Sequence, residues 1–336
     1  MSAGVRAGGR VARLTAAGVI TLTDDAVPSP GPGEALIRLT ACGVCGTDVH
    51  AYAGRPAALP IVLGHDAAGV VDALGPGTDS PAAIGERVTI DPTIACGACV
   101  YCTQSRPQLC LAGGYLGMTC DGTMASRIVV PARNLVPLPG TVTDVDATVL
   151  EPIAVALHVL ERLGPWTAKP VARVVGGGPL GIIAAQTLNS YGWETLVFEP
   201  LGHRREAGRA AGLDVRDSND APAGDPADGP VLVVETSATA GGVALASRLA
   251  TPGSAIAVVG RAPADFAAAD VLGRELTVFG SRGGSGTYPR AVELVRDGHV
   301  RPAAVVSHHF GLDETGEAMR AVTEPGTTVL RAVLAC

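Results

Sequence analysis

The sequence has almost no lysine and no long apolar run. Of its 25 basic residues only Lys169 is a lysine, so a mechanism that needs a second lysine is excluded. The net charge of −7 is spread without long runs of one sign, which argues against a nucleic-acid partner and against a membrane-surface patch. No stretch of about eighteen apolar residues occurs, so we expect no membrane span.

The N-terminal segment, MSAGVRAGGRVARL, lacks the apolar stretch of a secretory signal peptide. We therefore expect a cytoplasmic protein, in which cysteines stay reduced. In that compartment the eight cysteines are expected to be metal ligands or free thiols rather than disulfides.

The length of 336 residues exceeds the size at which one hydrophobic core keeps growing, which favours two domains. Residues 34–150 contain short segments rich in Val, Ile and Thr between glycines and prolines, a pattern typical of a compact, barrel-like β region. From residue 171 onward apolar strands alternate with helical stretches; the strands are expected at 171–175, 194–198, 231–235, 255–259 and 275–279. This alternation predicts an α/β fold with a doubly wound parallel sheet.

Four cysteines are clustered in the segment CGACVYCTQSRPQLC: Cys96, Cys99, Cys102 and Cys110. Four thiolates complete a tetrahedral zinc shell, and the two-residue gaps let one tight loop supply three of them. A closed shell has no open position, so the predicted role is structural. The alternatives are free thiols in a loop, or iron in place of zinc.

A glycine-rich turn, VVGGGPLG, follows an apolar strand and opens an amphipathic helix. Its glycines fit G-x-G-x-x-G, which lets a pyrophosphate approach the N-terminus of the helix. The alternative is a glycine turn that binds nothing. We predict that the turn binds a dinucleotide through Gly176, Gly178, Pro179, Leu180 and Gly181.

The strand after this helix ends in Glu199, where a carboxylate can accept both ribose hydroxyls and would repel a 2′-phosphate. Glu199 therefore favours NAD. Arg204 and Arg205 lie close behind it and argue for NADP, so we assign both Glu199 and Arg204 to the cofactor and expect NAD.

The segment ACGVCGTDVH has a C-x-x-C spacing that fits a redox pair, half of a zinc knuckle, or one functional cysteine next to a cysteine without a chemical role. Together with GHDAAGVV, EPIAVALH, the cysteine cluster and the glycine turn, it resembles the zinc-dependent medium-chain alcohol and polyol dehydrogenases from about residue 30 to the end. The resemblance implies a GroES-like β-rich catalytic domain over residues 1–152 and a Rossmann NAD-binding domain over 153–285. Residues 286–336 would return to the catalytic domain.

In that family the cysteine immediately before the G-T/S-D element binds a catalytic zinc, which corresponds to Cys45 and not to Cys42. The resemblance gives His65 as the second ligand and Glu151 as the third, and leaves a fourth position for water or substrate oxygen. The family motif G-H-E reads G-H-D here, so Asp66 is included as an additional candidate ligand. Two zinc ions per chain are therefore expected.

The resemblance also implies a proton relay and a cofactor contact. Thr47 corresponds to the hydroxyl that bonds the substrate oxygen, and His50 to the outer end of the relay; the alternative for His50 is a solvent-facing histidine. Asp48 is expected to orient His65. Arg331 corresponds to a basic residue that reaches the cofactor pyrophosphate, the alternative being an ordinary edge-strand arginine.

These features predict a zinc-dependent dehydrogenase that transfers a hydride between a secondary alcohol and NAD. Glu151 as third ligand points, through the resemblance, to polyol, sugar-alcohol, aminocyclitol or amino-alcohol substrates. The alternatives are a primary-alcohol or formaldehyde-type zinc dehydrogenase, and a zinc- and NAD-binding protein without turnover. A homodimer or homotetramer is expected, with a small alcohol or ketone as its substrate.

Overall fold

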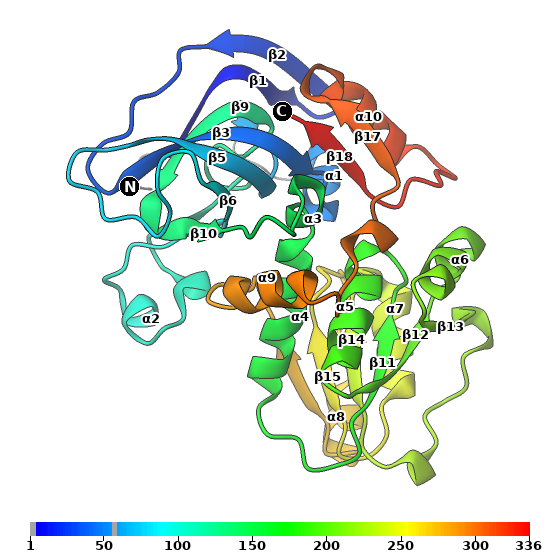
Figure 1. Cartoon of the computed structure of the whole chain (residues 1–336). Helices are drawn as coiled ribbons and strands as arrows, with labels where there is room; N and C mark the ends of the chain where they lie inside the picture. Colours follow the sequence, from blue (N-terminus) through cyan, green and yellow to red (C-terminus); the bar gives the residue numbers. More distant parts are fainter. Residues whose placement is uncertain (1–4, 56–58) are drawn as a thin grey trace. The chain divides into compact units, whose positions relative to one another are not determined.

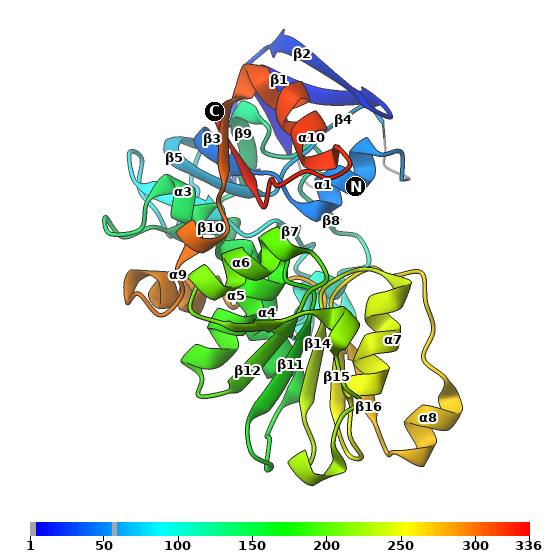
Figure 2. The ribbon, with the colours of Figure 1, turned by 90° about the vertical axis from the view of Figure 1, so that its right-hand side faces the viewer.

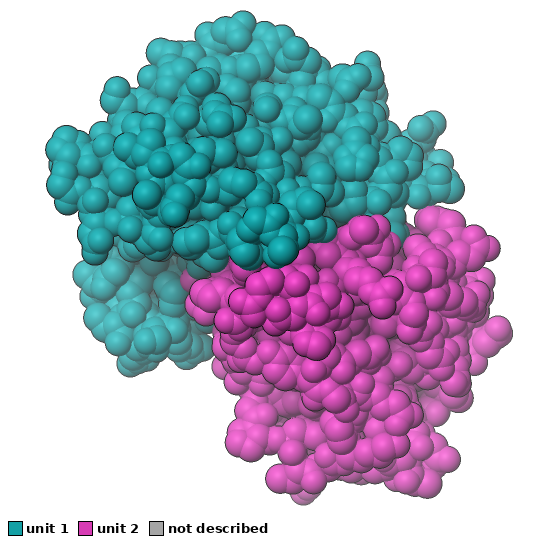
Figure 3. All heavy atoms as spheres, viewed as in Figure 1, with its two compact units in different colours: residues 1–151, 306–336 teal, residues 152–305 magenta. Residues whose placement is uncertain are grey.

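The computed structural model of the protein describes residues 5–55 and 59–336. The chain divides into two compact units (Figure 3), unit 1 comprising Met1–Glu151 and Val306–Cys336 and unit 2 comprising Pro152–Val305. Among the described residues, no helix combines the length and the apolar character needed to cross a bilayer.

Unit 1 is built on a largely antiparallel sheet with the central strand order β10-β6-β5-β3-β9-β1-β2 (Figure 1). The long central strands β3 (Glu34–Gly43) and β5 (Asp66–Leu74) pair in antiparallel register from Ala35↔Leu74 to Gly43↔Asp66. Consequently, the C-terminal end of β3 and the start of β5 lie side by side. The remaining strands of the path are β1 (Arg6–Ala16), β2 (Val19–Asp25), β6 (Arg87–Ile90), β9 (Ala125–Pro131) and β10 (Leu135–Pro137).

The C-terminal segment completes the same sheet. Strand β18 (Ala332–Ala335) pairs with β3 and with β17 (His308–Gly311), while β4 (Ile61–Val62) pairs with β1. Apolar side chains of these strands, such as Ile37 and Ile128, are fully buried in one core. The described part of unit 1 also contains the helices α1 (Gly46–Tyr52), α2 (Val100–Thr103), α3 (Asp144–Ala147) and α10 (Thr315–Thr323).

Unit 2 contains a six-stranded parallel sheet in the order β13-β12-β11-β14-β15-β16, which Figure 2 shows with the strands side by side. Its first strand along the chain, β11, is central, and the chain reverses direction across the sheet between β11 and β14. The strands are β11 (Val171–Val175), β12 (Glu194–Phe198), β13 (Asp214–Arg216), β14 (Leu232–Glu235), β15 (Ala255–Val258) and β16 (Thr277–Gly280). The α/β fold class and the doubly wound sheet predicted from the sequence are confirmed.

Helices connect these strands: α5 (Pro179–Ser190), α6 (Gly202–Ala210), α7 (Ala240–Leu249) and α8 (Ala268–Gly273), with α4 (Leu150–Leu163) preceding β11 and α9 (Tyr288–Arg296) following β16. The chain returns to unit 1 at Val306. The reason is local bonding: the Thr287 hydroxyl donates to the carbonyl of Ala154 at 3.0 Å, and the Arg301 amide donates to Gln186 at 2.7 Å.

Candidate functional site

The four clustered cysteines lie around the short helix α2 (Val100–Thr103) of unit 1. Their sulfur atoms lie within 4.8 Å of one another, and the Sγ–Sγ distance is 3.5 Å for Cys99–Cys102 and 3.9 Å for Cys99–Cys110. All four are free thiols. Zn–S bonds of about 2.3 Å in a tetrahedron place the sulfurs about 3.8 Å apart, so the spacing fits a zinc ion.

The backbone around the cluster favours negative charge on some of these sulfurs. Amide hydrogen bonds, first from Cys102 and then from Leu111, lower the pKa of Cys99 to about 6. Burial and the bond to Cys99 raise the pKa of Cys102 to about 11, because adjacent thiols cannot all ionise without a cation. The loop is therefore arranged to hold charge that a bound cation would neutralise.

The second group of ligand atoms forms where β3 ends and β5 begins. Cys45 precedes helix α1, and His65 and Asp66 stand at the start of β5; their ligand atoms all lie within 4.8 Å of one another. Gly64 has φ +90°, and a Cβ on it would lie 2.7 Å from Cys42 Sγ. Only glycine therefore fits immediately before His65. Cys42 itself is buried against the Thr123 hydroxyl, at 3.2 Å.

Asp48 fixes the backbone on both sides of this group. Its carboxylate accepts hydrogen bonds from the amides of Cys45 and Gly64, both at 2.9 Å. The distance from Asp48 Oδ1 to His65 Nδ1 is 4.0 Å, which is too long for a hydrogen bond. Asp48 thus positions the segments that carry Cys45 and His65.

Glu151, the predicted third ligand, lies in the first turn of α4 and outside this group of ligand atoms. Its Oε1 accepts a hydrogen bond from the hydroxyl of Tyr115 at 2.9 Å. The ring of Tyr115 also packs edge-on against His65, with centroids 5.4 Å apart. Tyr115 therefore connects Glu151 to the site, a role that the sequence reasoning missed.

Arg331, predicted to reach the cofactor, also has partners within unit 1. Its side chain is buried, forms an ion pair with Asp66, and donates to the carbonyl of Thr148 at 2.7 Å. A Cβ on Gly43 would collide with its guanidinium. In unit 1 Arg331 is thus a partner of the Asp66 carboxylate.

Several buried polar atoms at this site have no hydrogen-bond partner among the described residues, namely His65 Nδ1, Asp66 Oδ1 and Arg331 Nε. Burial and the charge of Asp66 raise the pKa of Glu151 to about 7. Burial lowers the pKa of His65, but the charges of Asp66 and Cys45 outweigh it and raise that pKa well above its usual value. A thiol, an imidazole and carboxyl groups together form a donor set that fits Zn²⁺.

The predicted relay residues lie on α1, next to Cys45. The Thr47 hydroxyl is 3.3 Å from Cys45 Sγ, and His50 follows in the last turn of the same helix, partly buried. Thr47 and His50 therefore follow Cys45 on one short helix.

The glycine turn of unit 2 joins β11 to α5 at the carboxyl edge of the parallel sheet. Gly176 has φ +102°, and a Cβ on Gly181 would lie 1.8 Å from the Gly176 carbonyl oxygen, so neither position tolerates a side chain. The turn lies where the chain reverses direction between β11 and β14, which is the usual position of a nucleotide in such sheets. Pro179 and Leu180 form the first residues of α5.

Glu199 stands at the end of β12, as predicted, but both of its carboxylate oxygens bond to backbone amides. They accept from Gly177 at 2.7 Å and from Leu201 at 2.9 Å, and the side chain is buried. Arg205 is engaged by Asp217 at 2.9 Å, whereas Arg204 lies near Gly178. Of the two arginines, Arg204 is thus the one at the glycine turn.

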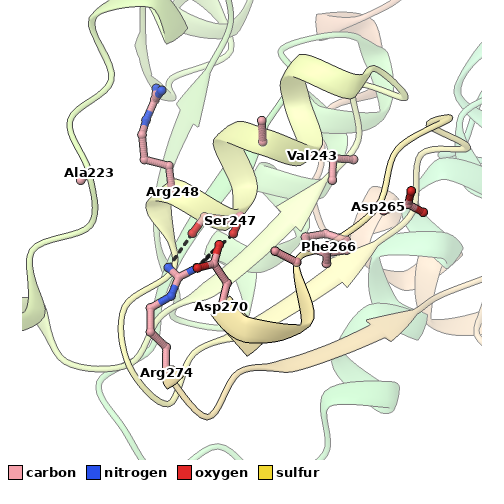
Figure 4. Close-up of a pocket in the computed structure, with 10 residues that line it drawn as sticks. Ala223, Val243, Ser247, Arg248, Asp265, Phe266, Asp270 and Arg274 are labelled. Atoms are coloured by element: carbon pink, nitrogen blue, oxygen red, sulfur yellow. Dashed lines mark hydrogen bonds and ion pairs between the residues drawn. The ribbon is translucent and has the colours of Figure 1, made fainter. Parts of the chain in front are cut away.

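A separate cavity of unit 2 is lined by residues of α7, α8 and the preceding loops (Figure 4). Arg274 there donates to the backbone and side chain of Ser247 at 2.8 and 3.0 Å and pairs with Asp270 at 3.4 Å. None of the described residues predicted to bind metal or cofactor lines this cavity. Of its charged lining residues, Arg274 and Asp270 pair with each other, and Arg248 donates to the carbonyl of Ala221.

Two family models match parts of the chain. The alcohol dehydrogenase GroES-like domain matches residues 31–140 of unit 1. An FAD-binding domain matches residues 169–217, the β11–α5–β12 segment of the kind that NAD- and FAD-binding proteins share.

Whole-chain relatives give a consistent picture. The chain is 30% identical over 311 residues to the starvation-sensing protein RspB of Escherichia coli K12, covering 89% of this chain and 91% of RspB. It is 29% identical over 315 residues to L-threonine 3-dehydrogenase of Pyrococcus horikoshii, covering 87% of this chain and 88% of that enzyme.

Solved structures match over nearly the full length. An alcohol dehydrogenase, RspB, of Escherichia coli CFT073 complexed with NADH superposes with a TM-score of 0.88 at 26% identity, covering 98% of this chain and 100% of that one. A putative zinc-binding dehydrogenase of Sinorhizobium meliloti bound to NADP has a TM-score of 0.86 at 27% identity, with 97% and 99% coverage.

Proposed function

Because this chain belongs to the zinc-dependent medium-chain alcohol and polyol dehydrogenase family, we propose that it transfers a hydride between a secondary alcohol and NAD. The substrate class would be a polyol, sugar alcohol, aminocyclitol or amino alcohol. The observation that carries the proposal is the donor set of unit 1, in which Cys45, His65 and Asp66 meet beside the Thr47 hydroxyl and Tyr115 contacts both His65 and Glu151.

Cys45, His65 and Glu151 are the proposed ligands of a catalytic zinc. Glu151 is preferred to Asp66 because the charge of Asp66 is already paired with Arg331, whereas the partner of Glu151 is the neutral phenol of Tyr115. When bound, the zinc would polarise the oxygen of the alcohol or ketone as a Lewis acid. Cys96, Cys99, Cys102 and Cys110 would hold a second, structural zinc.

The residues of α1 handle the proton. Thr47 Oγ1 can accept the hydrogen of the substrate hydroxyl and pass its own hydrogen on, and His50 Nδ1 or Nε2 can receive it nearer the end of the helix. Asp48 keeps this helix in place through the Cys45 amide. In the direction of oxidation, the reacting hydroxyl of the substrate would therefore lie within hydrogen-bond reach of Thr47 Oγ1.

The glycine turn of unit 2 and Glu199 would bind the cofactor, which supplies the hydride acceptor. A carboxylate at the end of β12 favours NAD, since it would repel a 2′-phosphate. Arg204 beside Gly178 supports NADP as the alternative, and the Sinorhizobium meliloti relative is bound to NADP. Kinetics with both cofactors decide between them.

A screen of polyols, aminocyclitols, amino alcohols and simple primary alcohols for NADH production tests the proposal. We expect turnover of a secondary alcohol in wild-type protein and its loss in Glu151→Ala with the fold retained. Preference for primary alcohols or formaldehyde adducts would favour the alternative dehydrogenase class. No turnover of any substrate, together with one zinc per chain, would leave a zinc- and NAD-binding protein without activity.

A further inference from the structure

Tyr115 is the last residue of a two-stranded ribbon that closes the cysteine loop. Strand β7 (Thr93–Ile94) pairs with β8 (Gly114–Tyr115), with Thr93 opposite Tyr115 and Ile94 opposite Gly114. All four clustered cysteines lie on the chain between these two strands. The loop therefore begins directly after β7 and ends directly before β8.

The ribbon is held firmly in unit 1. The amide of Leu116 donates to the Pro92 carbonyl at 3.1 Å, and the Leu116 side chain is fully buried. The Tyr115 amide donates to the Thr119 hydroxyl at 2.8 Å, and the Asn134 side chain donates to the Thr93 carbonyl at 2.8 Å. These bonds fix the backbone of Tyr115 close to the point where the loop ends.

The same ribbon continues onto the residues before His65. Gly117 and Gly122 pack so tightly on Gly64 that a Cβ on either would lie 2.6 Å or less from the Gly64 carbonyl oxygen. The Thr123 amide donates to that oxygen at 3.0 Å. The segment that follows Tyr115 therefore fixes the backbone that presents the imidazole.

The Tyr115 side chain contacts two of the three proposed ligands, Glu151 and His65. Its hydroxyl has one hydrogen, which is donated to Glu151 Oε1, and so leaves Oε2 as the oxygen available to a cation. Its ring meets the imidazole of His65 edge-on, at an interplanar angle of 66°. Partners of this kind set the orientation of metal ligands and typically change metal affinity by 10- to 100-fold.

We propose that Tyr115 is a positioning residue through which the cysteine loop orients Glu151 and His65. The metal assignment of those two residues rests on the proposed function, while the contacts themselves do not. Binding of zinc in the cysteine loop would then strengthen binding at the Cys45–His65–Glu151 site, because the ribbon that closes the loop carries Tyr115.

Zinc affinity, measured by competition with a chromophoric chelator, tests the positioning role without turnover. The signal of the Cys45 site is assigned with Cys45→Ser. Tyr115→Phe keeps the ring on His65 and removes the hydroxyl, so we expect that site to bind zinc about tenfold more weakly. The matched control is Tyr101→Phe, on α2 inside the loop, which should leave the affinity unchanged. Equal affinities of the Tyr115→Phe and wild-type proteins would overturn the proposal.

A double-mutant cycle tests the coupling to the loop. Cys110→Ser should weaken zinc binding at the Cys45 site in wild-type protein and have little further effect in the Tyr115→Phe background. Gly113→Ala is a second variant for the case in which Cys110→Ser does not fold, since its Cβ would meet the Ile94 carbonyl at 2.4 Å and the Cys110 side chain at 3.0 Å without removing a ligand. Additive effects would show that the loop does not act through Tyr115.

These outcomes are independent of the proposed function. If no alcohol is oxidised by the wild-type protein, the dehydrogenase proposal fails while the zinc affinities still report on Tyr115. If alcohol is oxidised and Tyr115→Phe binds zinc as the wild type does, the positioning proposal alone fails.

Discussion

The two metal-ligand groups of unit 1 differ in how the chain builds them. The cysteine cluster comes from one loop between residues 96 and 110, and its sulfurs approach one another around a four-residue helix. The Cys45 group is assembled from the end of β3, the start of β5, the first turn of α4 and the ribbon that carries Tyr115. The first depends on local sequence, and the second depends on the folded sheet.

This difference predicts opposite responses to the loss of one ligand. The cysteine cluster closes a loop and should stabilise the fold, whereas the Cys45 group sits on a core that is already packed. Substitution in the first should therefore act on stability and substitution in the second on turnover.

The largest effect is expected for Cys45→Ser. Loss of the thiolate removes a ligand of the proposed catalytic zinc, whose polarising effect is worth several kcal/mol, so kcat/KM should fall about 1000-fold. The melting temperature should change little. The measurement is steady-state kinetics beside thermal unfolding, and a large drop in stability with turnover per folded molecule preserved would reverse the assignment.

The next effect is expected for Cys102→Ser. Three thiolates cannot close the tetrahedral shell, and loss of a structural metal is among the changes that cost about 4 kcal/mol or more. Urea unfolding should show this loss, while the protein that remains folded should retain measurable alcohol oxidation. Cys120→Ser, outside both groups, is the matched control and should change neither quantity.

The pH dependence of the metal-depleted protein separates the two groups further. Burial and the charge of Asp66 raise the pKa of Glu151 from 4.5 to about 7, so between these pH values the folded chain keeps a proton that the unfolded chain has released. The free energy of unfolding should therefore fall as the pH rises across that window.

The part due to Glu151 is on the order of 3 kcal/mol. It is measured as the difference between wild-type and Glu151→Gln protein in urea titrations at about pH 5 and about pH 8. With zinc restored the carboxylate must be ionised, so the stabilisation by zinc should grow as the pH rises. Identical pH slopes for the two metal-depleted proteins would contradict this account of the site.

The smallest effect is expected at a residue of unit 2 that has an unusual backbone conformation. Ala238, after β14, has φ +55°, a conformation that glycine adopts more easily. Ala238→Gly should raise the free energy of unfolding by about 0.5–1 kcal/mol. Ala244→Gly, on the exposed side of α7, should lower it by about 1 kcal/mol. A loss of stability in both variants would show that Ala238 is not strained.

The same contrast explains what could be predicted from the sequence. The cysteine cluster, the glycine turn and most strands of the parallel sheet are local patterns, and the structure has them at the expected residues. Strand β13 was missed because three residues with one buried side chain give no pattern.

Cys45, His65 and Glu151 were suggested only by resemblance, because no spacing connects them. The bond of Tyr115 to Glu151 and the pairing of Arg331 with Asp66 join residues that are far apart in sequence. Whether Asp66 or Glu151 lies nearer to Cys45 depends on these contacts, and they exist only after the sheet has formed. That level of detail could not be read from the chain alone.

The most direct test of the central claim is the zinc content per chain of wild-type, Cys45→Ser and Cys102→Ser proteins, measured after dialysis and beside NADH production. We expect two zinc ions with turnover in the wild type, and one zinc without turnover in Cys45→Ser. Cys102→Ser should keep the zinc of the Cys45 site in its folded fraction. One zinc per wild-type chain, or unchanged zinc content and turnover in Cys45→Ser, would contradict the central claim.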